Sequence, residues 1–163
     1  MRGAALVFRL EAQLCAIGLE QVGEVMRPLP VRPVRGVPPY VAGISMIRGT
    51  PVPVIQAALL RGDLASPPVR FVTVSGGPSM VALAVGEVLG VYQIDLAGLA
   101  DLPPLLLPAN QPDTASFRLG TFEDEPLLFL RDARIIPGEV WDELTAQLAD
   151  RKLDRSPTPV GVG

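Results

Sequence analysis

The sequence predicts an all-β fold with a short helix near its C-terminal end. Apolar and polar residues alternate over many short segments, which is the pattern of half-buried strands. Turns rich in glycine and proline separate these segments, and 18 of the 163 residues are proline, roughly twice the usual share of about 5%. Short strands at regular spacing, joined by such turns, are typical of a β-sandwich or a pair of β-barrels.

The first strands are predicted close to the N-terminus. Segments 6–10 and 15–19 each alternate with period two and predict an opening hairpin. Cys15 lies within this pattern, so we interpret it as a small core residue. In 20–26 the apolar spacing changes to three and four, which predicts one helical turn. The prolines that follow prevent a longer helix.

The middle of the chain predicts an irregular segment, a strand and a helical turn. Residues 31–39 are rich in proline and predict irregular structure. Residues 50–55 predict a strand in which Pro51 and Pro53 point both imide nitrogens to one side. That strand should be an edge strand or lie next to a bulge. Residues 57–60 predict a short turn of helix.

The rest of the chain contains five more predicted strands. They are 69–74, 80–85, 87–94, 117–122 and 127–130. The first two and the last two predict hairpins, and the acidic turn 123–126 is interpreted as solvated. The stretch 95–112 is rich in proline and leucine. It is predicted to be an ordered, packed connection, because its leucines would otherwise be exposed.

A helix of about three turns is predicted to open at Pro137. Val140, Leu144 and Leu148 would lie on one of its faces, with Trp141 beside them. We expect a single domain over 4–151, followed by a disordered tail over 152–163.

The composition argues against several functional classes. The chain has no histidine and one cysteine, which removes Ser-His-Asp and Cys-His catalysis, histidine metal sites and an intramolecular disulfide. Glu20 and Glu24, four residues apart, are interpreted as a solvated face. No glycine loop that could cradle phosphate and no metal-binding motif occurs. We therefore predict a protein that is not an enzyme and binds no metal or cofactor.

Charge and hydropathy narrow the class of partner. The net charge is −3 and the basic residues are scattered, so no nucleic acid partner is expected. No apolar run approaches the roughly 20 residues of a membrane-spanning helix, and the N-terminus lacks the pattern of a signal peptide. The sequence predicts a cytoplasmic protein with no direct membrane insertion.

Six segments in series carry recognisable motifs. They read LVFRL at 6–10, LEQVGEV at 19–25, PPYVAGI and IRG within 38–49, PVI at 53–55, AVGEVLGV at 84–91, and a closing strand and short helix at 127–136. In this order and spacing they resemble the CheW-like domain family. The resemblance implies two intertwined five-stranded barrels of the SH3 type with a hydrophobic groove between them. One barrel would be built mainly from about 37–112, the other from the N-terminal strands plus about 115–136.

The resemblance also implies a function. Members of the family bridge the cytoplasmic tips of chemoreceptors to the regulatory domain of a CheA-type histidine kinase. It therefore implies a non-catalytic adaptor, recruited to the membrane through receptors. The positions implicated in partner binding match Val22, Glu24 and Arg48. Val85 and Val88 would line the groove, and the alternative for these two residues is plain barrel core.

The central motif has a physical logic of its own. Gly43 and Gly49 permit positive φ or close backbone approach, and Pro38 with its neighbouring proline fixes an extended entry. Arg48 would project beside the turn, where a guanidinium suits a bidentate contact with a carboxylate. That contact could lie within the domain, as a strut, or across an interface with a partner.

Four polar positions depart from the family pattern. Met46 replaces a usual asparagine, and Gln56, Gly86 and Arg131 each replace a usual aspartate. The apolar framework that decides folding is retained, whereas polar groups carry interface specificity. One alternative is therefore a divergent adaptor with other partners, in motility or development. A small β-barrel enzyme or ligand binder is a further alternative, and it would need polar side chains converging in a closed cavity.

Overall fold

The computed structural model describes residues 1–60, 66–101, 117–132 and 134–155, and for 149–155 it describes the helix alone. The strands are β1 (Arg2–Leu10), β2 (Gln13–Gly18), β3 (Val22–Met26), β4 (Val41–Ile47), β5 (Thr50–Gln56), β6 (Arg70–Ser75), β7 (Met80–Val85), β8 (Val88–Asp95), β9 (Ala100–Asp101), β10 (Phe117–Phe122) and β11 (Glu125–Leu130). The helices are α1 (Ala57–Leu60) and α2 (Gly138–Arg155), with 3-10 turns η1 (Leu19–Gln21) and η2 (Leu96–Gly98).

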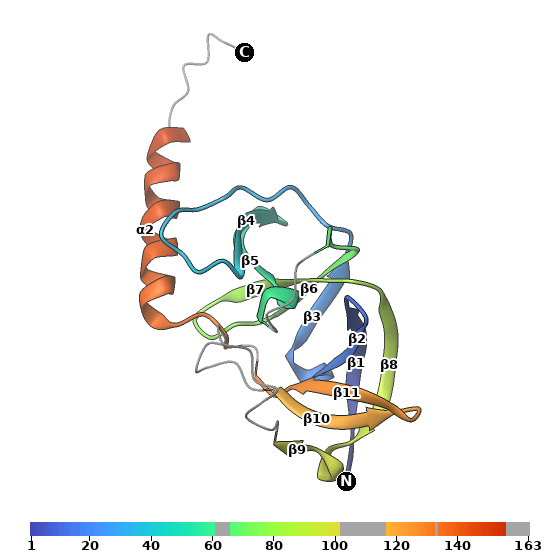
Figure 1. Cartoon of the computed structure of the whole chain (residues 1–163). Coiled ribbons are helices and arrows are strands. Elements are labelled where there is room, and N and C mark those ends of the chain that lie inside the picture. The colour runs from blue at the N-terminus through green and yellow to red at the C-terminus, as the bar shows by residue number, and fades with distance from the viewer. Residues whose placement is uncertain (61–65, 102–116, 133, 156–163) are drawn as a thin grey trace.

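The strands form two sheets. The first, called barrel 1 below, has six strands in the order β8-β1-β2-β11-β10-β9. The second, barrel 2, has five in the order β3-β6-β7-β5-β4. Each sheet is antiparallel except for one parallel pairing, β11 with β2 and β5 with β7. Barrel 2 occupies the upper part of Figure 1 and barrel 1 the lower part, with α2 alongside barrel 2.

Each sheet curls until the strands at or near its two edges approach one another. In barrel 2 the chain that leaves β3 returns along β4, where Arg32 and Ile44 exchange backbone hydrogen bonds of 2.8 and 2.9 Å. Ser45 Oγ also donates to the carbonyl of Pro30 at 2.9 Å. In barrel 1 the ring of Tyr92 on β8 lies edge-on against Phe122 on β10, with centroids 4.9 Å apart.

Strand alternation divides the apolar side chains among three cores. Barrel 1 encloses Ala5, Val7, Leu14, Ala16, Ile94, Leu127 and Phe129, and barrel 2 encloses Ile47, Val52, Val54, Phe71, Ala82 and Ala84. The largest core combines residues of both barrels and of α2. On β1, Leu6 and Phe8 join this shared core while their neighbours face the interior of barrel 1. Both faces of the inner strands are therefore buried, which fixes their register strongly.

Most of the elements predicted from the pattern are confirmed. The opening hairpin, the β6–β7 and β10–β11 hairpins, β8 and the short helix α1 all lie where alternation and turn residues predicted them. Cys15 is fully buried in the shared core. On α2, Val140 and Leu144 are buried and Leu148 packs against the same core, which confirms the predicted apolar face.

The predicted helical turn at 20–26 is wrong beyond its first residues. Only η1 is helical, and β3 follows it. Between the pairs Val22–Val74 and Val25–Val72 the register of β3 shifts. The apolar spacing of three therefore comes from a β-bulge, which inserts an extra residue and imitates helical spacing in the sequence.

The prolines of β5 lie next to a bulge, as one of the two predicted options required. β5 is an inner strand, between β7 and β4, and its register with β4 shifts between Val41 and Gly43. Ile44 directs its own N–H and C=O to Arg32, so Ile44 and Pro53 form a non-hydrogen-bonded pair. The proline nitrogen then faces β7, whose ladder begins only at Val54, and no ladder bond is lost.

The chain divides between the barrels differently from the predicted boundaries. β8 and β9, within 37–112, belong to barrel 1, and β3 belongs to barrel 2. α2 is longer than predicted and includes the first residues of the predicted tail 152–163. The rest of that tail and most of 95–112 lie outside the described residues. In the part of the chain that the structure describes, no helix is long and apolar enough to cross a membrane.

Candidate partner-binding surface

Arg48 occupies a strained position at the tip of the β4–β5 hairpin. Arg48 and Gly49 are the two residues of the turn between the paired Ile47 and Thr50, and their φ angles are 52° and 78°. Positive φ at both positions defines a type I′ turn, in which asparagine, aspartate and glycine are preferred. A positive φ is unfavourable for arginine, so the backbone of the turn gives no reason for an arginine at this position.

The side chain of Arg48 forms a bidentate ion pair with Glu24 on β3. Nε donates to Oε1 at 2.8 Å and Nη2 to Oε2 at 2.8 Å. This hydrogen-bonded contact lowers the pKa of Glu24 below its usual value and raises that of Arg48. β3 and β4 are the two outer strands of barrel 2, and Arg48 directly follows β4. The pair therefore connects the two edges of this sheet. The predicted bidentate contact with a carboxylate therefore exists within the domain.

The pair remains open to solvent. The Arg48 side chain is 78% exposed and the Glu24 side chain 35%. Exposed ion pairs add little stability, so the pair is a weak strut by itself. Glu24 binds one edge of the guanidinium, through Nε and Nη2. The other N–H groups of Arg48 can still donate hydrogen bonds to an acceptor on a partner. The two alternatives for Arg48 are thus compatible in geometry.

The Thr73 side chain on β6 holds the backbone of Glu24 in place. The Glu24 amide donates to Thr73 Oγ1 at 2.9 Å, and that hydroxyl donates to the Glu24 carbonyl at 3.4 Å. Thr73 lies on β6 opposite the β3 bulge and is 1% exposed. Its role was not predicted. The available signal was a hydroxyl between two valines of a predicted strand, since buried polar groups are normally hydrogen-bonded.

Val22 lies in a shallow hollow of about 410 Å³ beside the β6–β7 turn. The hollow is lined by Gln21–Gly23, Thr73–Ser75 and 77–80. Val22 is half-buried against the shared core, while Met80 at the rim is 43% exposed. The structure thus brings the three predicted binding residues Val22, Glu24 and Arg48 to neighbouring parts of barrel 2.

The glycine and proline positions of the central motif build the frame of this surface. A Cβ at Gly43 would overlap the carbonyl oxygen of Arg32, and the φ of Gly43 is 148°. Pro38 is the first residue of a turn in which its carbonyl accepts from Val41 N–H at 2.9 Å. The predicted extended entry is therefore a turn, with the second proline at the favoured second position.

Val85 and Val88 lie at the layer between the barrels. Val85 is 2% exposed and belongs to the shared core, and Val88 is half-buried against it. Val85 therefore has the packing of barrel core, the alternative given for it above. A role of these two residues in partner binding stays a prediction.

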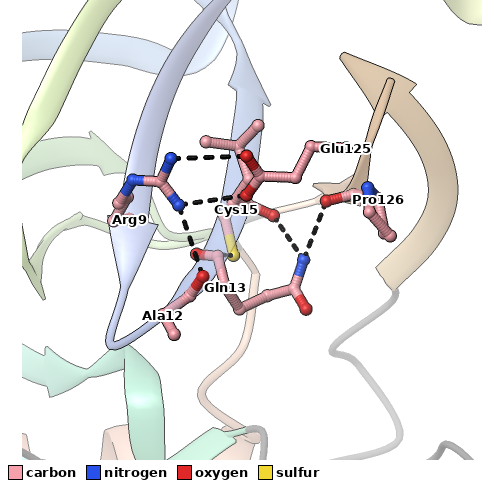
Figure 2. A network of polar contacts seen from close by, with 7 residues as sticks. Arg9, Ala12, Gln13, Cys15, Glu125 and Pro126 are labelled. Atoms are coloured by element: carbon pink, nitrogen blue, oxygen red, sulfur yellow. Dashed lines mark hydrogen bonds and ion pairs between the residues drawn. The ribbon is translucent and has the colours of Figure 1, made fainter. Parts of the chain in front are cut away.

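A second polar network lies around the β1–β2 turn of barrel 1 (Figure 2). Arg9 donates to Glu125 at 3.0 and 3.4 Å and to the Ala12 carbonyl at 3.3 Å. Gln13 Nε2 donates to the carbonyls of Leu14 and Pro126 at 2.9 and 3.1 Å. Glu125 was interpreted as part of a solvated turn and is instead half-buried and paired. The network joins the β1–β2 turn to β11 and serves the fold.

The four departures from the family pattern occupy different environments. Met46 is 44% exposed on β4, and Arg131 is exposed. Gln56 is half-buried at the end of β5, where its backbone N–H donates to the Tyr40 carbonyl at 2.7 Å. Gly86 donates its N–H to the Arg9 carbonyl at 2.8 Å, and a Cβ there would approach the same oxygen to 2.8 Å. Glycine at 86 therefore allows the barrels to touch.

The polar contacts described above hold turns and seams. Among the described residues, no three His, Cys, Asp or Glu side chains are placed to hold a metal ion. The molecule is thus a pair of β-barrels with a shared core and an open, polar and apolar surface on barrel 2.

Comparison with known proteins identifies the family. The model of the CheW-like domain matches residues 4–135, and the chain belongs to that family. The crystal structure of the scaffolding protein TtCheW from Thermoanaerobacter tengcongensis is similar, with a TM-score of 0.71 and 20% identity over 86% of this chain and 96% of that chain. This confirms the fold of two SH3-like barrels. No curated protein gave a significant match.

Proposed function

We propose that this protein is a non-catalytic adaptor that couples chemoreceptors to a CheA-type histidine kinase. Membership of the CheW-like family supports a scaffold in chemotaxis signalling. The observation that carries the proposal for this chain is the Glu24–Arg48 pair beside the Val22 hollow. Arginine is enriched among the residues that carry most of the binding energy at protein interfaces. A guanidinium that is exposed, held in one orientation and next to apolar side chains is suited to that role.

In this proposal the protein is cytoplasmic and reaches the membrane through its receptors. The surface around Val22, Glu24 and Arg48 binds the kinase regulatory domain or the receptor tip. The apolar layer that includes Val88 contributes to the contact with the receptor helices. The exposed Arg131 brings a charge, and the exposed Met46 puts an apolar side chain where the family usually has a polar one. Both set which receptor and kinase are accepted, because a changed side chain at an interface changes which partner it complements.

Binding measurements with purified partners test the proposal. The full chain is titrated with the cytoplasmic fragment of a receptor and with the regulatory domain of a kinase encoded beside it. We expect saturable binding to both, weakened by Arg48→Ala. Arg118→Ala is the matched control, because it breaks an ion pair of 3.3 Å with Asp101 on barrel 1, away from this surface. A folded protein that binds neither partner would refute the proposal.

A further inference from the structure

The chain between β3 and β4 presents an exposed run of prolines and arginines. Residues 27–35 read RPLPVRPVR. Arg27, Pro30 and Pro33 are spaced by three, and all are exposed. Among residues 27–35 only Val31 and Val34 are half-buried. We call residues 27–35 the docking segment.

The docking segment has the periodicity of a polyproline II helix. Each proline fixes its own φ near the polyproline II value, and each residue before a proline is restricted to extended conformations. Polyproline II has three residues per turn, so Val31 and Val34 share one edge. Val31 packs against the core of barrel 2 and Val34 against the shared core. The other two edges face solvent.

The segment is held in place by hydrogen bonds from both sides. The carbonyl of Pro30 accepts from Ser45, and Arg32 exchanges two backbone bonds with Ile44. At its end, Arg35 N–H donates to Gln147 Oε1 at 3.1 Å, and Gln147 Nε2 donates to the Arg35 carbonyl. Because the backbone is already ordered, a partner would lose little conformational entropy on binding it.

We propose that the docking segment binds a partner domain whose groove is lined by aromatic side chains and flanked by carboxylates. Proline-rich segments of the P-x-x-P type dock into such grooves as preformed helices. Pro30 and Pro33 provide this spacing, with Arg27 one turn before them on the same edge. Arg32 and Arg35 lie on the second exposed edge. Within the described residues, none of these three guanidinium groups forms an ion pair, so each is available to a carboxylate.

The partner is a different protein, because this chain offers no such groove. It has five phenylalanines, two tyrosines and one tryptophan, all within the described residues. Tyr92 alone among them is exposed. Its ring lies against Phe122, and one pair of rings does not line a groove for several turns of polyproline II.

The test uses the full chain and two purified probes, an SH3 domain that selects Arg-x-x-Pro-x-x-Pro and a WW domain. Calorimetric or NMR titration should show saturable binding to the SH3 probe, with the perturbed signals confined to 27–35. Pro33→Ala and Arg32→Glu should each weaken it by about tenfold or more, a change of about 1.4 kcal/mol. Arg2→Glu makes the same charge change on β1 and should leave the affinity unchanged.

Several outcomes would overturn the proposal. The proposal is wrong if the wild-type protein binds neither probe. It is also wrong if Pro33→Ala and Arg32→Glu leave the binding unchanged. Thermal unfolding checks that the variants fold. Arg32→Glu keeps the backbone bonds to Ile44, so it remains informative if Pro33→Ala is unstable. The same variants should bind receptor and kinase normally, which separates this proposal from the adaptor role.

Discussion

Replacing Gly43 by alanine should destabilise the protein far more than the same change at Gly49. At Gly43 the added Cβ overlaps the Arg32 carbonyl oxygen, and φ is 148°. Backbone strain of this kind costs about 1–3 kcal/mol. Relief of the overlap also breaks the two Arg32–Ile44 hydrogen bonds of 2.8 and 2.9 Å, worth about 1 kcal/mol each. The expected loss is about 3–5 kcal/mol in the free energy of unfolding.

Gly49→Ala isolates the conformational part of this effect. Gly49 has a φ of 78°, but a Cβ there would meet no atom within 4 Å. The expected loss is therefore only the strain of a left-handed residue, about 1–2 kcal/mol. Gly138→Ala is the neutral control, because Gly138 opens α2 with open space around its Cβ and no positive φ. All three changes share the same loss of entropy in the unfolded chain.

Chemical and thermal unfolding of the four proteins measure these differences. For a domain of this size, about 1 kcal/mol shifts the Tm by about 2–4 °C, so Gly43→Ala should lower the Tm by about 6–20 °C. Gly49→Ala should fall between it and Gly138→Ala. If Gly43→Ala costs no more than Gly49→Ala, the close approach of Arg32 does not matter and the reasoning is wrong.

Three further predictions concern the same surface. Arg48→Gly should have a higher Tm than Arg48→Ala, because both lose the ion pair and only glycine relieves the positive φ of 52°; the opposite order would exclude strain at the turn. The pKa of Glu24 is lowered by Arg48, so the stability that Glu24 contributes is present above the unfolded pKa of about 4.3 and is lost as pH falls through the folded pKa. Denaturant unfolding should therefore separate wild type from Glu24→Gln at pH 7 and give equal stabilities near pH 2, and a difference that persists in acid would contradict this. Thr73→Val should cost about 1–3 kcal/mol, since it leaves the Glu24 amide without its acceptor, whereas Thr121→Val at an exposed site should be nearly neutral in the same unfolding assay.

The sequence predicted the strands well because their alternation is a local property. In β1 and β2, apolar residues recur with period two, and both faces of these strands proved to be buried, one inside barrel 1 and one in the shared core. Turn residues then placed the hairpins. The helix face of Val140 and Leu144 was equally local, since it needs only spacing within one element.

Features that depend on contacts between distant segments were not predicted. The β3 bulge resembles a helical turn in the sequence, and only pairing with β6 around Thr73 decides between them. Arg9 and Glu125 are 116 residues apart, so nothing local distinguishes Glu125 from its solvated neighbours. The assignment of β8 to barrel 1 likewise follows from its register with β1, which spacing within either strand does not contain.

Arg48 shows how one position can carry both folding and binding information. Glycine in its place would form the same turn with less strain, so the turn alone does not explain the arginine. The ion pair to Glu24 is exposed, so stability alone does not explain it either. What remains is orientation: the pair holds a guanidinium at the rim of barrel 2 near the Val22 hollow. Strained residues with a fixed side-chain direction occur at binding surfaces as well as in structural turns, so partner contact by Arg48 stays a prediction that the binding of Arg48→Ala tests.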